Sequence, residues 1–149
     1  MELEKEIKQS KFKSEHHKVA VNIIYTSNWL SSLHAKILKK HGITLQQFNV
    51  LRILRGQHPN PATVNLLIDR MLDKMSNASR LVDKLKAKGL VERKACKEDR
   101  RAVDVLITPK GLDLLAQLDK SEKEMNDSVS LITVSEAKEL NRILDKMRG

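Results

Sequence analysis

Residues 76–108 read SNASRLVDKLKAKGLVERKACKEDRRAVDVLIT, and this stretch decides the fold. Its first part repeats apolar residues at i, i+3, i+4 and i+7, which is the spacing of one buried helix face. These residues are Ala78, Leu81, Val82 and Leu85. Ser76 is expected to cap the helix at its start, because a serine hydroxyl accepts a free backbone N–H there. Gly89 suits the left-handed position that ends such a helix.

The second part of the stretch predicts a two-stranded ribbon. Residues 90–94 form the first expected strand and residues 102–107 the second, in which β-branched residues recur with a period of two. The residues that alternate are Val103, Val105 and Ile107. The loop at 95–101 is too polar to bury, and its cations are Lys97, Arg100 and Arg101. A helix that leads into a ribbon with a cationic tip predicts a winged helix-turn-helix.

The order of these motifs resembles the MarR family of bacterial transcription regulators. SxxSRLVDKLxxKGLVER is followed by KEDRR and then by LITPKG, and with the flanking helices the resemblance covers nearly the whole chain. Its most specific parts are the Asp99-Arg100-Arg101 wing and residues 108–111. The resemblance implies a homodimer that binds a pseudo-palindromic operator in double-stranded DNA, usually as a repressor. It also implies release from DNA by a small phenolic or lipophilic effector.

Length, charge and cysteine count limit the classes of protein to which the chain can belong. The 149 residues suffice for one domain with a sizeable core, and the formal net charge is +9. Residues 70–110 hold 12 Lys or Arg against 6 Asp or Glu. The positive excess therefore lies around the helix expected to read the DNA bases, which begins near Ser76, and it favours a polyanionic partner. The single cysteine permits no disulfide within the chain, and the sequence contains no signal core or apolar span. We therefore expect a cytoplasmic protein that makes no membrane contact.

Helical periodicity accounts for the first part of the chain. Residues 1–13 are charged and are expected to fray. A long helix is expected over residues 14–41, and it exposes more apolar surface than a small winged helix can cover. Thr44 opens a second helix with capping-box spacing, and a short third helix follows a proline-rich turn.

The C-terminal part is expected to be helical as well. Thr108 and Pro109 open a helix expected to run unbroken to about residue 130, and Ser135 is expected to begin the last helix. Pairing across a two-fold axis would bury the apolar stripes near both termini. The fold class is therefore mainly α with a small β wing (α+β), in a single domain, 1–149. Its parts are dimerisation helices at 14–42 and 112–149 and a winged helix-turn-helix lobe at 44–108.

The first turns of a helix in the major groove lie closest to the base edges. The candidate DNA-binding residues on the helix are Ser76, Asn77, Ser79, Arg80 and Lys84. Arg80 can pair with a guanine or clamp a phosphate. Asp83 is expected to pair with Arg80 or Lys84 and to orient them, because phosphates repel a carboxylate.

The candidate DNA-binding residues of the wing are Lys97, Asp99, Arg100 and Arg101. An arginine at the wing tip can enter the narrow minor groove, and Arg101 is slightly favoured over Arg100. The family resemblance implies that Asp99 braces one of the two. Cys96 lies among cations that favour a thiolate, so a redox role is open, although the chain holds no second cysteine to resolve an oxidised thiol.

An effector pocket is expected near the junction of the dimer helices and the lobe. Its candidate lining is Tyr25, Trp29, His34, His41 and Phe48. The alternative for Tyr25 and Trp29 is packing in the dimer core, and the two roles are compatible.

An enzyme is not expected. The five histidines form no metal-binding spacing, and there is no nucleophile elbow or phosphate-cradling glycine loop, so no catalytic residue, metal or cofactor is predicted. The alternatives are a non-specific DNA-binding or architectural protein and a winged-helix protein-interaction module. A binder without sequence preference would not need small polar residues at the start of a reading helix.

Overall fold

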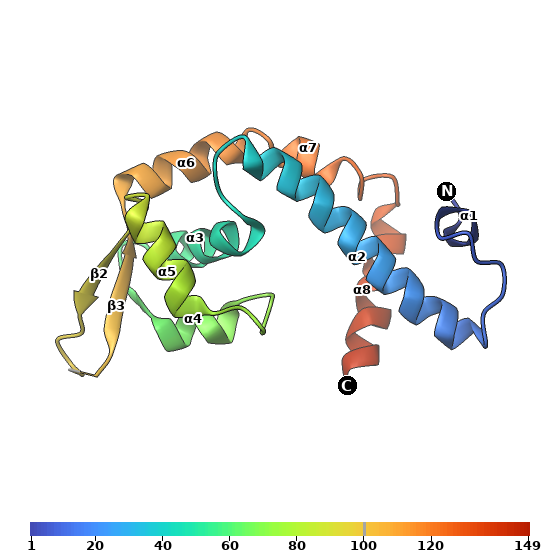
Figure 1. Cartoon of the computed structure of the whole chain (residues 1–149), viewed down its shortest axis with the longest axis horizontal. Helices are drawn as coiled ribbons and strands as arrows, with labels where there is room; N and C mark the ends of the chain where they lie inside the picture. The colour runs from blue at the N-terminus through green and yellow to red at the C-terminus, as the bar shows by residue number, and fades with distance from the viewer. Residues whose placement is uncertain (100) are drawn as a thin grey trace.

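The structure is a computed structural model, and it describes residues 1–99 and 101–149. A lobe and a helical arch make up the molecule, with the lobe at one end of the arch and α1 and α8 at the other (Figure 1). The elements are α1 (Leu3–Glu6), α2 (Glu15–Lys39), α3 (Leu45–Gln57), β1 (Ala62–Thr63), α4 (Val64–Arg70), α5 (Ala78–Ala87), β2 (Val91–Ala95), β3 (Val103–Ile107), α6 (Pro109–Asp119), α7 (Glu122–Asn126) and α8 (Val134–Arg148). The predicted class, mainly α with a small β wing, is confirmed. None of the helices within these residues is long and apolar enough to cross a membrane.

The core of the lobe lies where α3, α4 and α5 pack against the sheet. Side chains from all four elements are fully buried there, so the apolar faces read from the sequence do meet. They include Leu51, Leu54, Leu67, Val82, Leu85 and Val105. This packing fixes α5 against the sheet and leaves its opposite face exposed.

The sheet has three antiparallel strands in the order β1-β3-β2, one more than the predicted ribbon. Val91 pairs with Ile107 and Ala95 with Val103, which confirms the ribbon of β2 and β3. The extra strand, β1, pairs Ala62 with Val105. Two residues are too few to show a period, so β1 is defined by its hydrogen bonds to β3 and has no pattern of its own.

Three predicted helix boundaries are confirmed by their capping groups. The hydroxyl of Thr44 accepts from the Gln47 N–H at 3.2 Å, and the Gln47 side chain accepts from the Thr44 N–H at 3.2 Å, which completes a capping box. Thr108 accepts from the Gly111 N–H at 3.1 Å. Gly89 has a φ of 72°, the left-handed conformation that ends a helix at lowest cost.

The helix expected to run unbroken from Pro109 to about residue 130 is instead divided into α6 and α7. The backbone of Ser121, between them, has φ −93° and ψ 3° and leaves the helical conformation. Each side of the break is held by a different neighbour. Asp119 of α6 pairs with Arg55 of α3 at 2.8 Å. The Met125 carbonyl of α7 lies 3.1 Å from Nε2 of His34 in α2. The prediction was wrong because the break has no glycine or proline to mark it, and the contacts on its two sides join residues far apart in the sequence.

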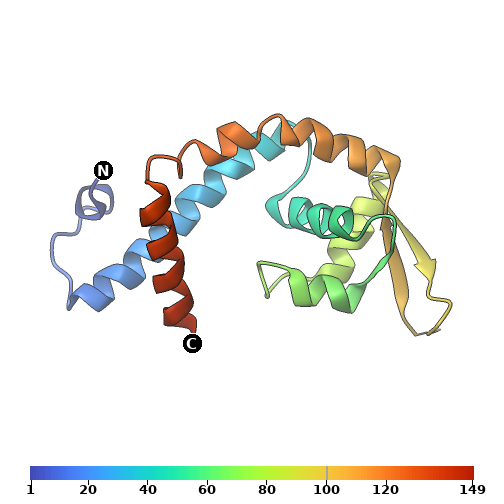
Figure 2. The same cartoon turned by 180° about the vertical axis from the view of Figure 1, so that it is seen from behind.

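The last helix, α8, begins after Thr133, two residues before the predicted start at Ser135. Thr133 and Glu136 form a capping box that the sequence pattern already contained. Figure 2 shows α8 descending from the end of the arch across the line of α2. Within the described chain α8 buries none of its residues, and four of its large apolar side chains are exposed: Val134, Leu140, Ile143 and Met147.

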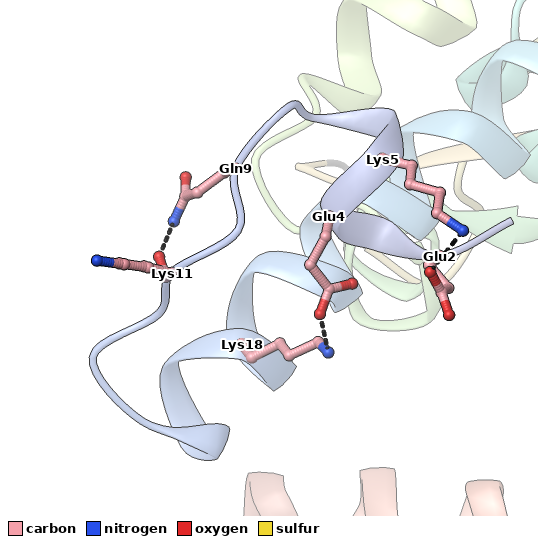
Figure 3. A network of polar contacts seen from close by, with 6 residues as sticks. All are labelled: Glu2, Glu4, Lys5, Gln9, Lys11 and Lys18. Carbon is pink, nitrogen blue, oxygen red and sulfur yellow. Dashed lines mark hydrogen bonds and ion pairs between the residues drawn. The ribbon is translucent and has the colours of Figure 1, made fainter.

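Residues 1–13 were expected to fray, but within them Leu3–Glu6 forms α1, which docks on α2. Leu3 of α1 is buried, and Lys18 of α2 pairs with Glu4 (Figure 3). The hydroxyl of Tyr25 donates to Glu6 at 2.7 Å, and this hydrogen bond raises the pKa of Tyr25. The prediction counted only the charge of the segment. A short charged segment can still dock when its apolar side chain and its carboxylates meet partners on a neighbouring helix.

The docking of α1 is expected to depend on pH through this ion pair. The hydrogen bond from Lys18 lowers the pKa of Glu4 from 4.5, so its contribution is complete above pH 4.5 and is lost as the pH falls through the lowered value. The same bond raises the pKa of Lys18 from 10.5, so that contribution is lost only as the pH rises past 10.5. Amide chemical shifts of Leu3 and Ile7 during an acid titration would measure the release. If they change only together with those of α3, global unfolding is the cause and the prediction is wrong.

Candidate nucleic-acid interface

The helix that the sequence predicts to read the bases is α5, called the reading helix below, and its apolar and polar faces are separated as predicted. Ala78, Val82 and Leu85 are buried against the lobe. The opposite face is exposed, and its polar residues include Ser79, Arg80, Asp83 and Lys84. A helix held in this way can enter a major groove with its first turn foremost.

The start of α5 differs from the prediction at two residues. The cap is Asn77, whose Oδ1 accepts from the Arg80 N–H at 3.1 Å, whereas Ser76 was expected to do this. The Ser76 hydroxyl is buried, and it has no hydrogen-bond partner among the residues that the structure describes. Asparagine and serine are similarly good caps, so the residue types alone left the boundary one position uncertain. Ser79 and Arg80 are therefore the exposed groups of the first turn.

This arrangement predicts opposite behaviour for two neighbouring alanine variants. Ser76→Ala is expected to leave the unfolding free energy unchanged or slightly higher, because it removes a buried hydroxyl that makes no bond. Asn77→Ala is expected to lower it by about 1 kcal/mol through loss of the cap. Chemical denaturation at one fixed protein concentration would measure both. Equal destabilisation by the two variants would show that the Ser76 hydroxyl is bonded after all.

Asp83 was expected to pair with Arg80 or Lys84, and this is wrong. Its carboxylate instead pairs with Arg93 of β2. Gly89 reverses the chain direction after α5, and β2 then runs back along the helix, so a residue ten positions away comes within reach. The pair neutralises a carboxylate on the reading face and ties the helix to the wing.

The wing is organised by a tight turn at its tip. Asp99 Oδ1 accepts from the backbone N–H of Arg101 at 2.9 Å, and the Asp99 carbonyl accepts from the Ala102 N–H at 3.1 Å. The Asp99 carboxylate thus holds the backbone of Arg101, one of the two arginines that the family resemblance implied it would brace. The side chains of Lys97 and Arg101 are exposed. Arg100, the other candidate for the minor groove, lies outside the described residues.

The half-buried Cys96 lies at the base of the same loop, where its N–H donates to the Ala102 carbonyl at 3.2 Å. This contact belongs to the backbone and does not involve the thiol. The redox role therefore remains a hypothesis.

The side chains of Lys88 and Asn49 hold α5 and the turn before it in place through three hydrogen bonds that the sequence did not reveal. Lys88 donates to the Gly42 carbonyl and to Gln47 Oε1, the latter at 3.0 Å, so the end of α5 is fastened to the α2–α3 turn. Asn49 Oδ1 accepts from the Leu72 N–H at 2.9 Å and holds the turn that leads into α5. None of these bonds has a sequence motif, because each joins segments distant along the chain.

The five candidate effector residues do not share one pocket. His34 and Phe48 line a hollow of about 650 Å³ between the arch and the lobe. Tyr25 and Trp29 instead line a second hollow, of about 510 Å³, between α1 and α2. His41 lines neither of these two hollows of the described chain. The prediction placed all five together because they share one helix and its end, but α2 is long enough to serve two separate surfaces.

The hollow between arch and lobe has a mixed lining. The Arg52 guanidinium carbon lies 5.7 Å from the centre of the Phe48 ring. The Arg55–Asp119 ion pair crosses the junction, and Leu72 and Asp73 of the turn before α5 complete the wall. A guest in this hollow would touch α2, α3, α7 and that turn at the same time.

Comparison with known proteins agrees with this geometry. The sequence profile of the MarR family matches residues 41–102. The regulator MgrA of Staphylococcus aureus is 29% identical over 112 residues, which are 75% of this chain and 74% of MgrA. A MarR transcription factor from Planctomyces limnophilus is 28% identical, with a TM-score of 0.69 over 91% of this chain and 98% of that one. A cysteine-to-serine mutant of MarR from E. coli, solved with operator DNA, shares the fold at 24% identity, with a TM-score of 0.79 over 93% of this chain and 99% of that one.

The match therefore spans the lobe that carries the reading helix and part of the wing, and the structural likeness extends over the arch. The chain is similar to the MarR family of bacterial transcription regulators, in sequence over this lobe and in fold over nearly its whole length.

Proposed function

We propose that this regulator is a homodimeric repressor that binds a pseudo-palindromic operator in double-stranded DNA. The observation that carries the proposal is the exposed first turn of α5, with Ser79 and Arg80, tied to a wing that exposes Arg101. The Asp83–Arg93 pair fixes the two cationic elements relative to each other. One lobe can then set Arg80 against base edges in the major groove while Arg101 enters the neighbouring minor groove.

The homodimer is supported by apolar surface that the single chain leaves uncovered. On α2 the side chains of Val19, Ile23 and Ile24 are exposed, and on α8 those of Leu140, Ile143 and Met147. Two such stripes on helices of one arch form a patch of the kind that marks an interface. A two-fold axis through the ends of the arches would cover both stripes at once and present two lobes about one helical turn of DNA apart.

Release by a small molecule is supported by the hollow of about 650 Å³ between arch and lobe. Two structural neighbours have ligands: BpsR of Bordetella bronchiseptica is regulated by 6-hydroxynicotinic acid, and the organohalide sensor RdhR was solved with 2,4-dichlorophenol. In this chain the hollow borders Leu72 and Asp73, so a phenolic or lipophilic guest would displace the turn that leads into α5. The orientation of the reading helix would then change and the two lobes would lose their match to the operator.

The test is binding to genomic fragments. The purified chain is incubated with sheared DNA of its own genome, and the bound fragments are sequenced and then footprinted at stated salt. We expect two protected half-sites of inverted sequence about 10 base pairs apart, centre to centre. Equal competition by bulk DNA would assign the chain to the non-specific architectural class, and no binding at all would favour an interaction module.

The effector part is tested separately on the operator found in this way. Addition of 2,4-dichlorophenol or 6-hydroxynicotinic acid is expected to raise the dissociation constant. The matched control is Asn49→Leu, which narrows the hollow and removes the bond to the Leu72 N–H. Release that is unchanged in this variant would locate the effector elsewhere.

A further inference from the structure

The entry turn, residues 71–77 between α4 and α5, is anchored at both ends (Figure 1). Met71 at its start and Ala78 just after it are buried, so the core of the lobe holds the chain on either side. Within the turn, Oδ1 of Asp73 accepts from the Met75 N–H at 2.9 Å. The entry turn therefore has a defined shape and presents its outward side chains at defined positions.

Met75 is an apolar side chain that this turn holds in water. Its exposed fraction is 92%, and it precedes the helix cap Asn77 by two residues, with Arg80 in the first turn of α5 beyond. Two other large apolar side chains are exposed in the described part of the lobe: Leu72, which lines the hollow between arch and lobe, and Ile68 of α4. Met75 thus adds an apolar group to the polar reading face at its entry.

We propose that Met75 contacts the C5 methyl group of a thymine in the major groove of each half-site and so selects the base at that position. The inference rests on the proposed function and adds to it one base position and the residue that reads it. The thymine methyl is the apolar group that the major groove offers. Methionine suits this contact, because its unbranched side chain adapts to the groove and has no charge with which to bind phosphates of any sequence.

The position of Met75 favours a base edge over the phosphate backbone. The first turn of a recognition helix lies closest to the bases, and the entry turn leads directly into it. The cation of the entry turn, Lys74, is engaged elsewhere, because its Nζ donates to the Ile68 carbonyl at 3.2 Å and to the Asp69 carbonyl. Lys74 therefore completes the end of α4, and Met75 and Arg80 are left to meet the groove, one with an apolar group and the other with a charge.

The test begins with the DNA. Deoxyuridine in place of thymine removes the methyl group and leaves the hydrogen-bonding groups of the base pair unchanged. The operator recovered from genomic fragments is rebuilt with deoxyuridine at each symmetric pair of thymines in turn, and the dissociation constants are measured by fluorescence anisotropy at one salt concentration. Loss of one buried methyl corresponds to roughly fourfold weaker binding, so the contacted pair, changed in both half-sites, should weaken binding roughly tenfold to twentyfold.

Two variants at position 75 then identify the residue that reads the methyl, in a double-mutant cycle of protein against DNA. Met75→Gln keeps the length of the side chain but makes it polar, so it should bind the thymine and deoxyuridine operators equally at the contacted pair. Met75→Leu keeps an apolar side chain and should retain most of the preference. Met75 is exposed in the free protein, so both variants should unfold at the Tm of the wild type. Thymine pairs elsewhere in the operator are the control, and their response to deoxyuridine should be the same in all three proteins.

The possible results separate this inference from the proposed function. If the chain selects an operator but Met75→Gln keeps the methyl preference of the wild type at every thymine pair, the contact is overturned and the proposed function stands. A chain that prefers no DNA fragment overturns both. If Met75→Gln binds every operator as the wild type does and instead weakens the dimer, the side chain contacts the second copy and the inference is wrong.

Discussion

The Arg101→Ala dimer is expected to fold as the wild type does and to bind its operator roughly tenfold to a hundredfold more weakly. Arg101 is exposed in the wing loop, and the structural role at this position belongs to its backbone N–H, which donates to Asp99 and survives the substitution. The lost group is a guanidinium that the negative potential of a narrow minor groove attracts. The slope of the logarithm of affinity against the logarithm of salt concentration should also become shallower by about one unit, because one fewer counterion is released on binding.

Fluorescence anisotropy with a labelled operator, at several salt concentrations, measures both effects. The matched control is Lys120→Ala, which removes one exposed cation at the end of α6, away from the wing, and should change the affinity little. If Arg101→Ala binds as tightly as the wild type, the wing does not enter the minor groove through this residue. A parallel loss with Lys120→Ala would mean that overall charge, and not the wing, decides affinity.

Gly111→Ala is expected to be the most destabilising glycine-to-alanine substitution in the chain, lowering the free energy of unfolding by about 3 kcal/mol. Gly111 is buried in the first turn of α6, where the end of the sheet meets the arch. A Cβ there would lie 2.4 Å from the Leu90 carbonyl oxygen and 2.7 Å from Cγ1 of Ile107. That carbonyl already accepts from the Thr108 N–H at 3.1 Å, so the backbone cannot retreat without breaking the junction.

Gly56→Ala is the matched control. This glycine lies within α3, and a Cβ there would meet nothing within 4 Å. Alanine is the better helix former, so we expect a gain of about 0.5–1 kcal/mol. Thermal unfolding at one fixed protein concentration should separate the two variants. The Tm of Gly111→Ala should lie roughly 6–12 °C below that of the wild type. A Gly111→Ala protein with wild-type stability would show that α6 can shift away from the sheet.

The elements that local chemistry defines were predictable from the sequence. Thr44, Gly89 and Thr108 mark boundaries by their own side chain or backbone freedom, and the structure has each where it was expected. The apolar face of α5 and the alternation in β3 follow from periods of 3.6 and 2 residues, which neighbours do not alter. The exposure of Arg80 on the reading face was predictable for the same reason.

Features that depend on a distant partner were not predictable in this way. Asp83 could have paired with any nearby cation, and only the path of β2 selects Arg93. The break at Ser121 contains no glycine or proline, and α1 carries charges that look solvated until α2 supplies partners. The candidate effector residues were grouped by sequence proximity. The 25 residues of α2 span far more than one pocket, so His34 and Trp29 line different hollows.

The break between α6 and α7 has a consequence for how such a regulator can diverge. Asp119 anchors the lobe side of the break to α3, and Met125 anchors the other side to α2. In the proposed homodimer, the length and angle of the stretch between these anchors set how far apart the two lobes stand, whereas α5 and the wing are the segments proposed to contact the bases. Different mutations can thus alter the spacing of the half-sites and their base sequence. The preferred spacing can change during evolution while the preferred sequence stays the same.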